Sequence, residues 1–319
     1  MPVLHGVGAR RAGMGGSLAG GSDDISGMMQ AILRTAFPLP AGRRRPFTWP
    51  WQDRAGRLSI LRAVVFALLL APLAWVAAEA ALHQLGPEPW KAALKEIGQW
   101  TIRLLLLTLA VTPLGKILAE PRLLALRRLL GLTTLAYAGL HLLLYAGHEN
   151  FRLGKVASEI VLRPYLTIGF AALLGLVALG WTSTDGWIRA LGPRWRRLHV
   201  LIFPIAALGV LHFYWQSKSV VWEAVLAGGL LSWLLLWRVL PAAWRLRLPA
   251  LLALVPLTAL AAASLEYAWY ALATNLPAQR ILFANLDVSF GLRPALWAGV
   301  AALAVPALAL AWRWLPGRR

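Results

Sequence analysis

Long apolar runs separated by short basic segments dominate the chain. A helix that crosses a membrane needs about 20 predominantly apolar residues. Eight runs meet this requirement, at residues 59–85, 97–119, 124–147, 165–184, 198–216, 220–240, 248–272 and 294–315. The seventh run is the weakest, because it contains Pro249, Pro256 and Glu266. The pattern predicts an all-α fold, a polytopic integral membrane helical bundle of about eight transmembrane helices.

The same pattern divides the chain into three parts. Residues 1–58 form an N-terminal extension, predicted to be cytoplasmic and partly disordered. Its first 27 residues are glycine-rich and lack the apolar stretch of a signal peptide. Residues 59–247 form a membrane core with six runs, and residues 248–319 add further transmembrane helices. The translation start stays open among Met1, Met28 and Met29.

Charge predicts which way the bundle faces. Hydrophobic residues make up 59% of the chain and charged residues only 14%. In soluble domains about a quarter of the residues are charged. The net charge of +19 comes largely from arginines in alternate connecting segments. The positive-inside rule explains that distribution with both termini in the cytoplasm of a bacterial inner membrane. Nucleic acid is therefore not expected as a partner.

Candidate chemistry lies with three histidines inside the apolar runs: His141, His199 and His212. An ionisable ring within a bilayer is costly and usually functional. Neutral imidazole is a common ligand of haem iron. The chain has no cysteine, which excludes thiolate haem ligation and cysteine-bound iron–sulfur clusters. The three histidines predict haem held between membrane helices.

Helical spacing favours one pair among the three. His141 follows Arg127 by 14 residues and His212 follows His199 by 13, each interval spanning about 20 Å of helix. His141 and His212 are therefore predicted to share the outer level of the membrane and one haem. A step of 13 turns His199 about 140° away from His212, unless Pro204 kinks the helix. His199 is the candidate for a second haem, without a histidine partner at its level.

Plainer interpretations remain open for each polar residue in the runs. A buried histidine often only bonds a backbone carbonyl or a neighbouring helix. His148 and His83 lie at run ends and are expected to be interfacial. Arg127 and Arg128 are most simply positive-inside anchors, and alternatively partners of a haem propionate or of an anionic headgroup. Glu266 and Glu79 are expected to be paired or to reach the membrane edge, and alternatively to carry protons. The sequence has no dinucleotide fingerprint, phosphate-binding loop or HExxH motif.

Six blocks resemble a known family in order along the chain. They are LTLAVTPLGK (107–116), LRRLLGL (126–132), the YAGLHLLLY block around His141, RPYLTIG (163–169), LGWTSTDGWIRALGPRWRRLH (179–199) and LHFYWQSKS (211–219). From residue 98 to about 219 the chain resembles the MsrQ family. This family is the haem-binding membrane subunit of the periplasmic protein-methionine-sulfoxide reductase system. It belongs to the ferric-reductase-like transmembrane group, so 59–247 would be a ferric-reductase-like haem core.

The resemblance implies a haem b subunit that passes electrons from the quinone pool to a periplasmic molybdenum-containing (molybdopterin) methionine sulfoxide reductase. That catalytic subunit, the partner in a heterodimer, repairs oxidised periplasmic proteins. The resemblance carries His141, His199 and His212 over as haem iron ligands, with Arg127 or Arg128 near a second haem. It also implies FMN as a cofactor.

The chain departs from the family pattern at both ends, by two further apolar runs after residue 240 and a longer N-terminal extension. It lacks the cytosolic nicotinamide-binding domain of NADPH oxidases, so oxidation of NADPH by this chain is not expected. Three alternatives stay open. They are a stand-alone ferric or quinone reductase-like cytochrome b, a non-redox proton-coupled transporter, and a non-catalytic scaffold subunit.

Overall fold

The prediction of a polytopic helical membrane protein is confirmed by a computed structural model, which describes residues 49–52, 55–218, 220–289 and 291–314. Most of the predicted N-terminal extension and its possible start sites lie outside the described residues. Within the described ranges there is no strand, and eight helical spans are long and apolar enough to cross a membrane. The spans are α2 (Ile60–Ala81), α3 (Pro89–Ile117), α4–α5 (Pro121–Leu124 and Arg127–His148), α7 (Pro164–Trp181), α9–α10 (Pro193–His199 and Ile202–Ser217), α11 (Trp222–Val239), α12 (Leu248–Ala273) and α14 (Pro294–Arg313).

Prolines mark where several of these helices begin. Pro89, Pro121, Pro164, Pro193 and Pro294 each occupy the first turn of a helix. There the missing N–H of proline costs nothing, because the first amides of a helix have no intrahelical partner. The span predicted from residue 97 therefore starts eight residues earlier, at Pro89, through a polar first stretch that the hydrophobic pattern did not include.

Short helices connect the spans where the sequence predicted only loops. They are α6 (Leu153–Leu162), α8 (Asp185–Leu191) and α13 (Ala278–Phe283). The side chain of Thr184 caps α8 by accepting a hydrogen bond from the Trp187 amide. Gly192 then separates α8 from α9 with a positive φ of 50°, a conformation that glycine adopts at low cost.

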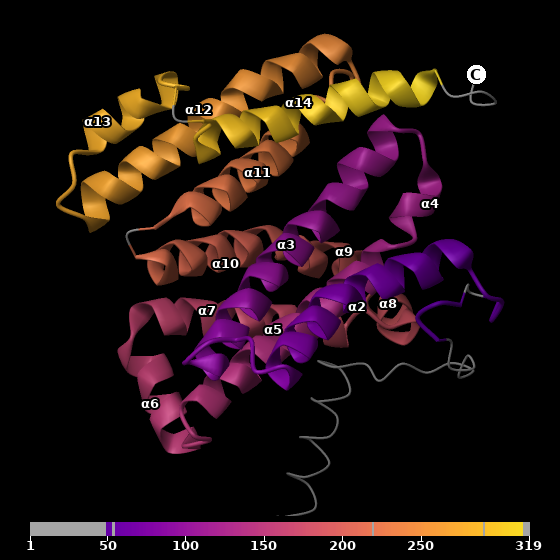
Figure 1. The fold of residues 1–319 in the computed structure, drawn as a ribbon. Coiled ribbons are helices and arrows are strands. Elements are labelled where there is room, and N and C mark those ends of the chain that lie inside the picture. The colour runs from indigo at the N-terminus through magenta and orange to yellow at the C-terminus, as the bar shows by residue number, and fades with distance from the viewer. Residues whose placement is uncertain (1–48, 53–54, 219, 290, 315–319) are drawn as a thin grey trace, which may run out of the picture.

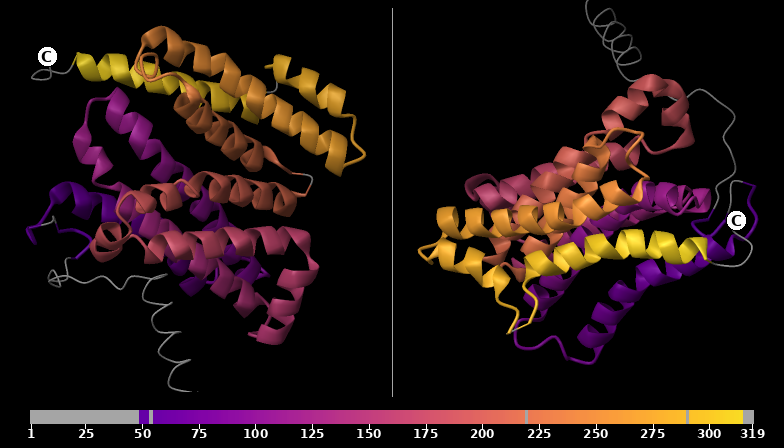
Figure 2. Two further views of the ribbon diagram at one scale, coloured as in Figure 1. Left: turned by 180° about the vertical axis from the view of Figure 1, so that it is seen from behind. Right: turned by 90° about the horizontal axis from the view of Figure 1, so that it is seen from above.

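The helix α3 lies at the centre of the bundle. It packs along α5, and α7 packs along α10 in a second helix pair. One apolar cluster joins α3 to α2 and α5, and a larger one joins it to α7, α10, α11, α12 and α14. In Figure 1 the C-terminal helices α11–α14 form one side of the molecule and α2 lies on the other. Figure 2 shows the same order from behind.

The C-terminal helices hold a buried charge. Glu266 on α12 is 2% exposed. An Arg293 guanidinium nitrogen lies 2.6 Å from one of its carboxylate oxygens, and the Asn285 amide donates to the other at 3.1 Å. Glu266 is thus paired, one of the roles expected from the sequence. The ion pair links the start of α14 to the C-terminal third of α12.

Candidate functional site

The structure brings His141 and His212 together. His141 extends from α5 and His212 from α10, and their ring centroids lie 6.3 Å apart with the ring planes at 83°. Neither helix packs mainly on the other, because α5 lies along α3 and α10 along α7. The two imidazoles thus bring side chains of α5 and α10 together across the bundle.

A backbone carbonyl fixes each of these rings. His141 Nδ1 lies 3.0 Å from the carbonyl oxygen of Leu94 on α3, and His212 Nδ1 lies 2.8 Å from that of Tyr165 on α7. A carbonyl oxygen can only accept, so Nδ1 donates its N–H in both contacts. The tautomer that results leaves Nε2 with its lone pair available, the arrangement usual for a histidine that ligates a metal.

The spacing of the two rings fits a single iron between them. An imidazole nitrogen binds a metal at about 2 Å, and it lies roughly 1 Å from its own ring centre. Two rings on opposite sides of one iron then have centroids roughly 6 Å apart, which agrees with the 6.3 Å in the structure. The perpendicular ring planes are compatible with this role, in which His141 and His212 would each offer one Nε2 lone pair to the iron.

The third candidate, His199, lies in a separate environment. Its ring stacks on Trp195, with centroids 3.9 Å apart and planes at 27°. Its Nδ1 lies 3.1 Å from the Trp195 carbonyl oxygen, and its Nε2 lies 3.4 Å from Ser183 Oγ. Arg128, predicted at the same level, pairs with Asp185 at 2.9 Å. Because Ser183 Oγ already lies beside His199 Nε2, an iron bound at this nitrogen would have to displace the Ser183 side chain.

A break in the helix separates His199 from His212. The helix α9 ends at His199 and α10 begins at Ile202. Pro204 follows in the first turn of α10, where its missing N–H leaves no hydrogen bond unmade. The regular helix is thus interrupted at Val200 and Leu201, just before Pro204, where the backbone hydrogen bonds change from the i−4 to the i−3 pattern.

The remaining histidines of the described chain lie at helix ends, as predicted for interfacial residues. His148 is the last residue of α5, and His83 lies in the turn after α2. Among the described residues, no group of three or more His, Cys, Asp or Glu side chains could hold a bare metal ion. The His141–His212 pair is suited instead to an iron whose equatorial ligands come from a porphyrin.

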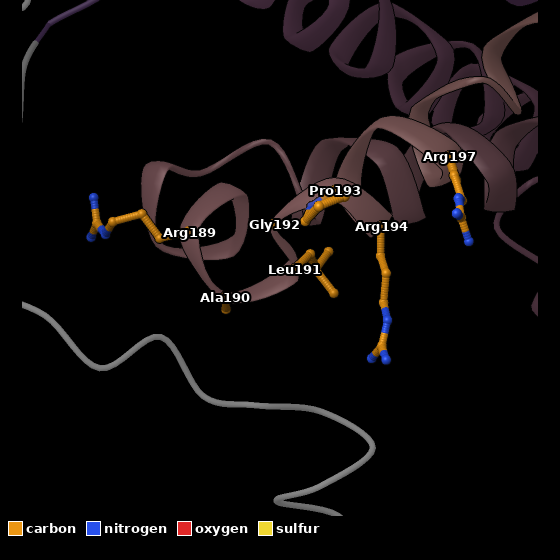
Figure 3. A pocket seen from close by; sticks show the side chains of 7 residues that line it. All are labelled: Arg189, Ala190, Leu191, Gly192, Pro193, Arg194 and Arg197. Atoms are coloured by element: carbon orange, nitrogen blue, oxygen red, sulfur yellow. The ribbon is translucent and has the colours of Figure 1, made fainter.

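A shallow basic pocket of about 430 Å³ lies between α8 and α9, at the end of the bundle opposite to α6 (Figure 1 and Figure 3). Three arginines contribute to its lining: Arg189, Arg194 and Arg197. In Figure 3 their side chains extend in different directions and do not converge on one point. This arrangement is typical of a basic membrane-facing end rather than of a built site for one anion.

Two features of the His141–His212 site were missed from the sequence. The groups that orient the rings are main-chain oxygens of Leu94 and Tyr165, which carry no side-chain signal. The second is the helix pairing of α3 with α5 and of α7 with α10, which decides which carbonyls are within reach. The histidines themselves were visible because ionisable residues stand out in apolar runs.

Comparison with known proteins places the chain in a family. Residues 97–210 match the family model described as ferric reductase like transmembrane component. This range contains His141 and His199 and stops two residues before His212. No solved structure matches the chain.

Several similar relatives share one name, protein-methionine-sulfoxide reductase heme-binding subunit MsrQ. One from Xanthomonas campestris pv. campestris (strain B100) is 43% identical over 185 residues, which are 56% of this chain and 85% of the relative. One from Caulobacter vibrioides is 38% identical over 183 residues, 57% of this chain and 87% of the relative. With most of each relative covered at this identity, and with eight apolar helices long enough to cross a membrane, the chain belongs to the MsrQ family of membrane redox subunits.

Proposed function

We propose that the chain is a haem b electron-transfer subunit of the bacterial inner membrane. It would pass electrons from the quinone pool to a periplasmic molybdenum-containing methionine sulfoxide reductase. The observation that carries this proposal is the 6.3 Å approach of the His141 and His212 rings from two different helices. The names of the relatives support it, because they describe heme-binding subunits of a methionine sulfoxide reductase.

The residues of the chain would hold and tune the iron. His141 and His212 supply Nε2 lone pairs, while the Leu94 and Tyr165 carbonyls accept the Nδ1 protons. These outer hydrogen bonds fix the ring orientation and make each imidazole a stronger donor. When bound, haem supplies reversible one-electron iron chemistry at a potential set by its axial ligands and their surroundings. Apolar helices around the pair limit the access of water.

Other elements of the proposal rest on the family resemblance. They are the quinone, the heterodimer with the molybdopterin partner, FMN, and a second haem at His199 with Arg127 or Arg128 nearby. The chain contributes orientation to this route: its basic segments face the cytoplasm under the positive-inside rule, which puts His141 and His212 toward the periplasm. Electrons delivered to this pair would then be within reach of a periplasmic partner.

Reconstitution tests the route directly. The purified chain in lipid vesicles, supplied with a quinol and the periplasmic molybdenum subunit, should reduce methionine sulfoxide in a protein substrate. The His141→Ala chain, inserted equally well, should not. Equal turnover with the two chains would contradict the proposal. Reduction of ferric chelates or quinones by the chain without the partner would support the stand-alone reductase instead.

A further inference from the structure

The two halves of the His141–His212 site repeat the same local arrangement. Each histidine lies 47 residues after the carbonyl that its Nδ1 contacts. In each half a glycine follows the acceptor residue by four positions: Gly98 after Leu94, and Gly169 after Tyr165. Each glycine is preceded by isoleucine and each histidine by leucine. The α3–α5 pair and the α7–α10 pair therefore present one module twice, at an offset of 71 residues.

Both histidine rings lie against the bare backbone of these glycines. A Cβ added at Gly98 would lie 2.7 Å from His141 Cε1 and 2.8 Å from its Nδ1. A Cβ added at Gly169 would lie 2.7 Å from His212 Nδ1 and 2.8 Å from its Cε1. Ordinary carbon contacts are about 3.5–4.0 Å. Even the smallest side chain would thus exclude both rings from their observed positions.

Glycine inside a helix requires a reason, because it destabilises the helix relative to alanine. Here the missing side chain lets each imidazole approach the helix closely enough for Nδ1 to reach a carbonyl one turn earlier. We propose that Gly98 and Gly169 are positioning residues, which set the orientation of His141 and His212 as ligands. This inference rests on the proposed function, since it concerns the direction in which each Nε2 points.

A methyl group at Gly98 or Gly169 should displace the adjacent histidine ring without unfolding the helices. The imidazole can turn away from it, but turning breaks the Nδ1–carbonyl hydrogen bond and redirects Nε2. Loss of such an outer contact typically costs about 10- to 100-fold in metal affinity. The Gly98→Ala and Gly169→Ala chains should therefore bind haem more weakly, with one axial imidazole lost or displaced.

The chain offers two matched controls. Gly139 lies on α5, two residues before His141, and a Cβ there would meet nothing within 4 Å. Gly175 lies on α7, and a Cβ there would meet Ile205 Cδ1 on α10 at 2.6 Å. Gly139→Ala controls for the gain in helix propensity. Gly175→Ala controls for crowding between the same two helices that hold His212.

The experiment uses the full-length chain, purified in detergent with its haem. The haem dissociation constant, the electron paramagnetic resonance spectrum of the oxidised iron and the midpoint potential are measured for all four alanine variants. Thermal unfolding is recorded alongside. Gly98→Ala and Gly169→Ala should weaken haem binding about 10- to 100-fold, change the spectrum and shift the potential. Both control variants should match the parent in these three readouts.

Two results would overturn the inference. One is a parent-like spectrum, potential and haem affinity in both Gly98→Ala and Gly169→Ala. The other is an equal change in Gly175→Ala, which would mean that helix packing in general, not the ring contact, controls the site. The His141→Ala chain separates the positioning role from the proposed function. If this chain keeps its full haem content, the ligand assignment fails. If it loses its haem while both glycine variants match the parent, only the positioning role is refuted.

Discussion

At the residue scale, the candidate site consists of two imidazole rings, His141 and His212, each hydrogen-bonded to a main-chain carbonyl. The sequence identified His141 and His212 because a titratable ring inside an apolar run is rarely accidental. Helical spacing also paired them at one level. It could not show the Leu94 and Tyr165 carbonyls, because backbone acceptors look alike in any sequence and only the packing of helices selects them.

Removal of either paired histidine should empty the site. His141→Ala and His212→Ala would each remove one of the two nitrogens offered to the iron. We expect haem affinity to fall by more than the roughly 10- to 100-fold that is typical of an outer-contact change, so that the purified variants retain little haem. The measurement is the iron-to-protein ratio with the reduced-minus-oxidised spectrum. His148→Ala, at the end of the same helix, is the control and should keep its haem. Full haem content in both paired variants would contradict the assignment.

His199 should be independent of this pair. It lies 13 residues before His212, about 20 Å along the helix, and its ring stacks on Trp195. We expect His199→Ala to retain the resonance spectrum of the His141–His212 iron. Loss of that spectrum in a chain that still inserts into the membrane would show that the two positions share one iron.

At the scale of elements, the hydrophobic pattern predicted all eight spans and misplaced some of their starts. It missed the polar first turns of α3, because an apolar count excludes Lys91 and Lys95 although the helix continues through them. It missed α6, α8 and α13, because a search for runs of about 20 apolar residues passes over helices this short. It allowed a kink at Pro204 but could not place the break at Val200 and Leu201.

The buried ion pair between α12 and α14 should control the stability of the C-terminal helices. Arg293→Leu would leave the Glu266 carboxylate buried without its cation, a change that typically costs about 3–5 kcal/mol. Thermal unfolding in detergent should show the loss. The exposed Arg280 on α13 gives the control, and Arg280→Leu should change little. If Arg293→Leu unfolds like the parent, the pair does not stabilise this region.

Replacing both partners tests the same pair from the other side. The double variant Glu266→Leu/Arg293→Leu removes both charges, and replacing a buried ion pair by apolar residues is often neutral or stabilising. We therefore expect the double variant to recover most of the stability lost in Arg293→Leu. A double variant that is less stable than the single one would mean that the carboxylate has another role in the described core.

The whole molecule is a bundle with distinct ends. The arginine-bearing segments around α4, α8 and α9 lie at the end where α14 finishes, and α6 and α13 lie at the other (Figure 1). The C-terminal helices join the rest mainly through α11, which packs on α3 and α10, and Trp269 of α12 adds a ring contact to Tyr214 of α10. His141 lies within the residues that match the family model, and His212 lies two residues beyond them. The helices α12–α14 are not part of this site.

The orientation of this bundle can be tested because the chain has no cysteine. Single cysteines at two exposed alanines, Ala157 on α6 and Ala190 on α8, mark the two ends. In intact cells whose outer membrane has been made permeable, a maleimide that cannot cross the inner membrane should label Ala157→Cys and spare Ala190→Cys. The reverse pattern would place His141 and His212 near the cytoplasm and remove the basis for a periplasmic acceptor.

The most direct test of the central claim is an electron paramagnetic resonance spectrum of the oxidised, purified chain, with iron quantified in the same sample. We predict a low-spin ferric haem with two axial imidazoles, lost on replacement of His141 or His212. An iron-free preparation that still supports methionine sulfoxide reduction with its partner would contradict the account.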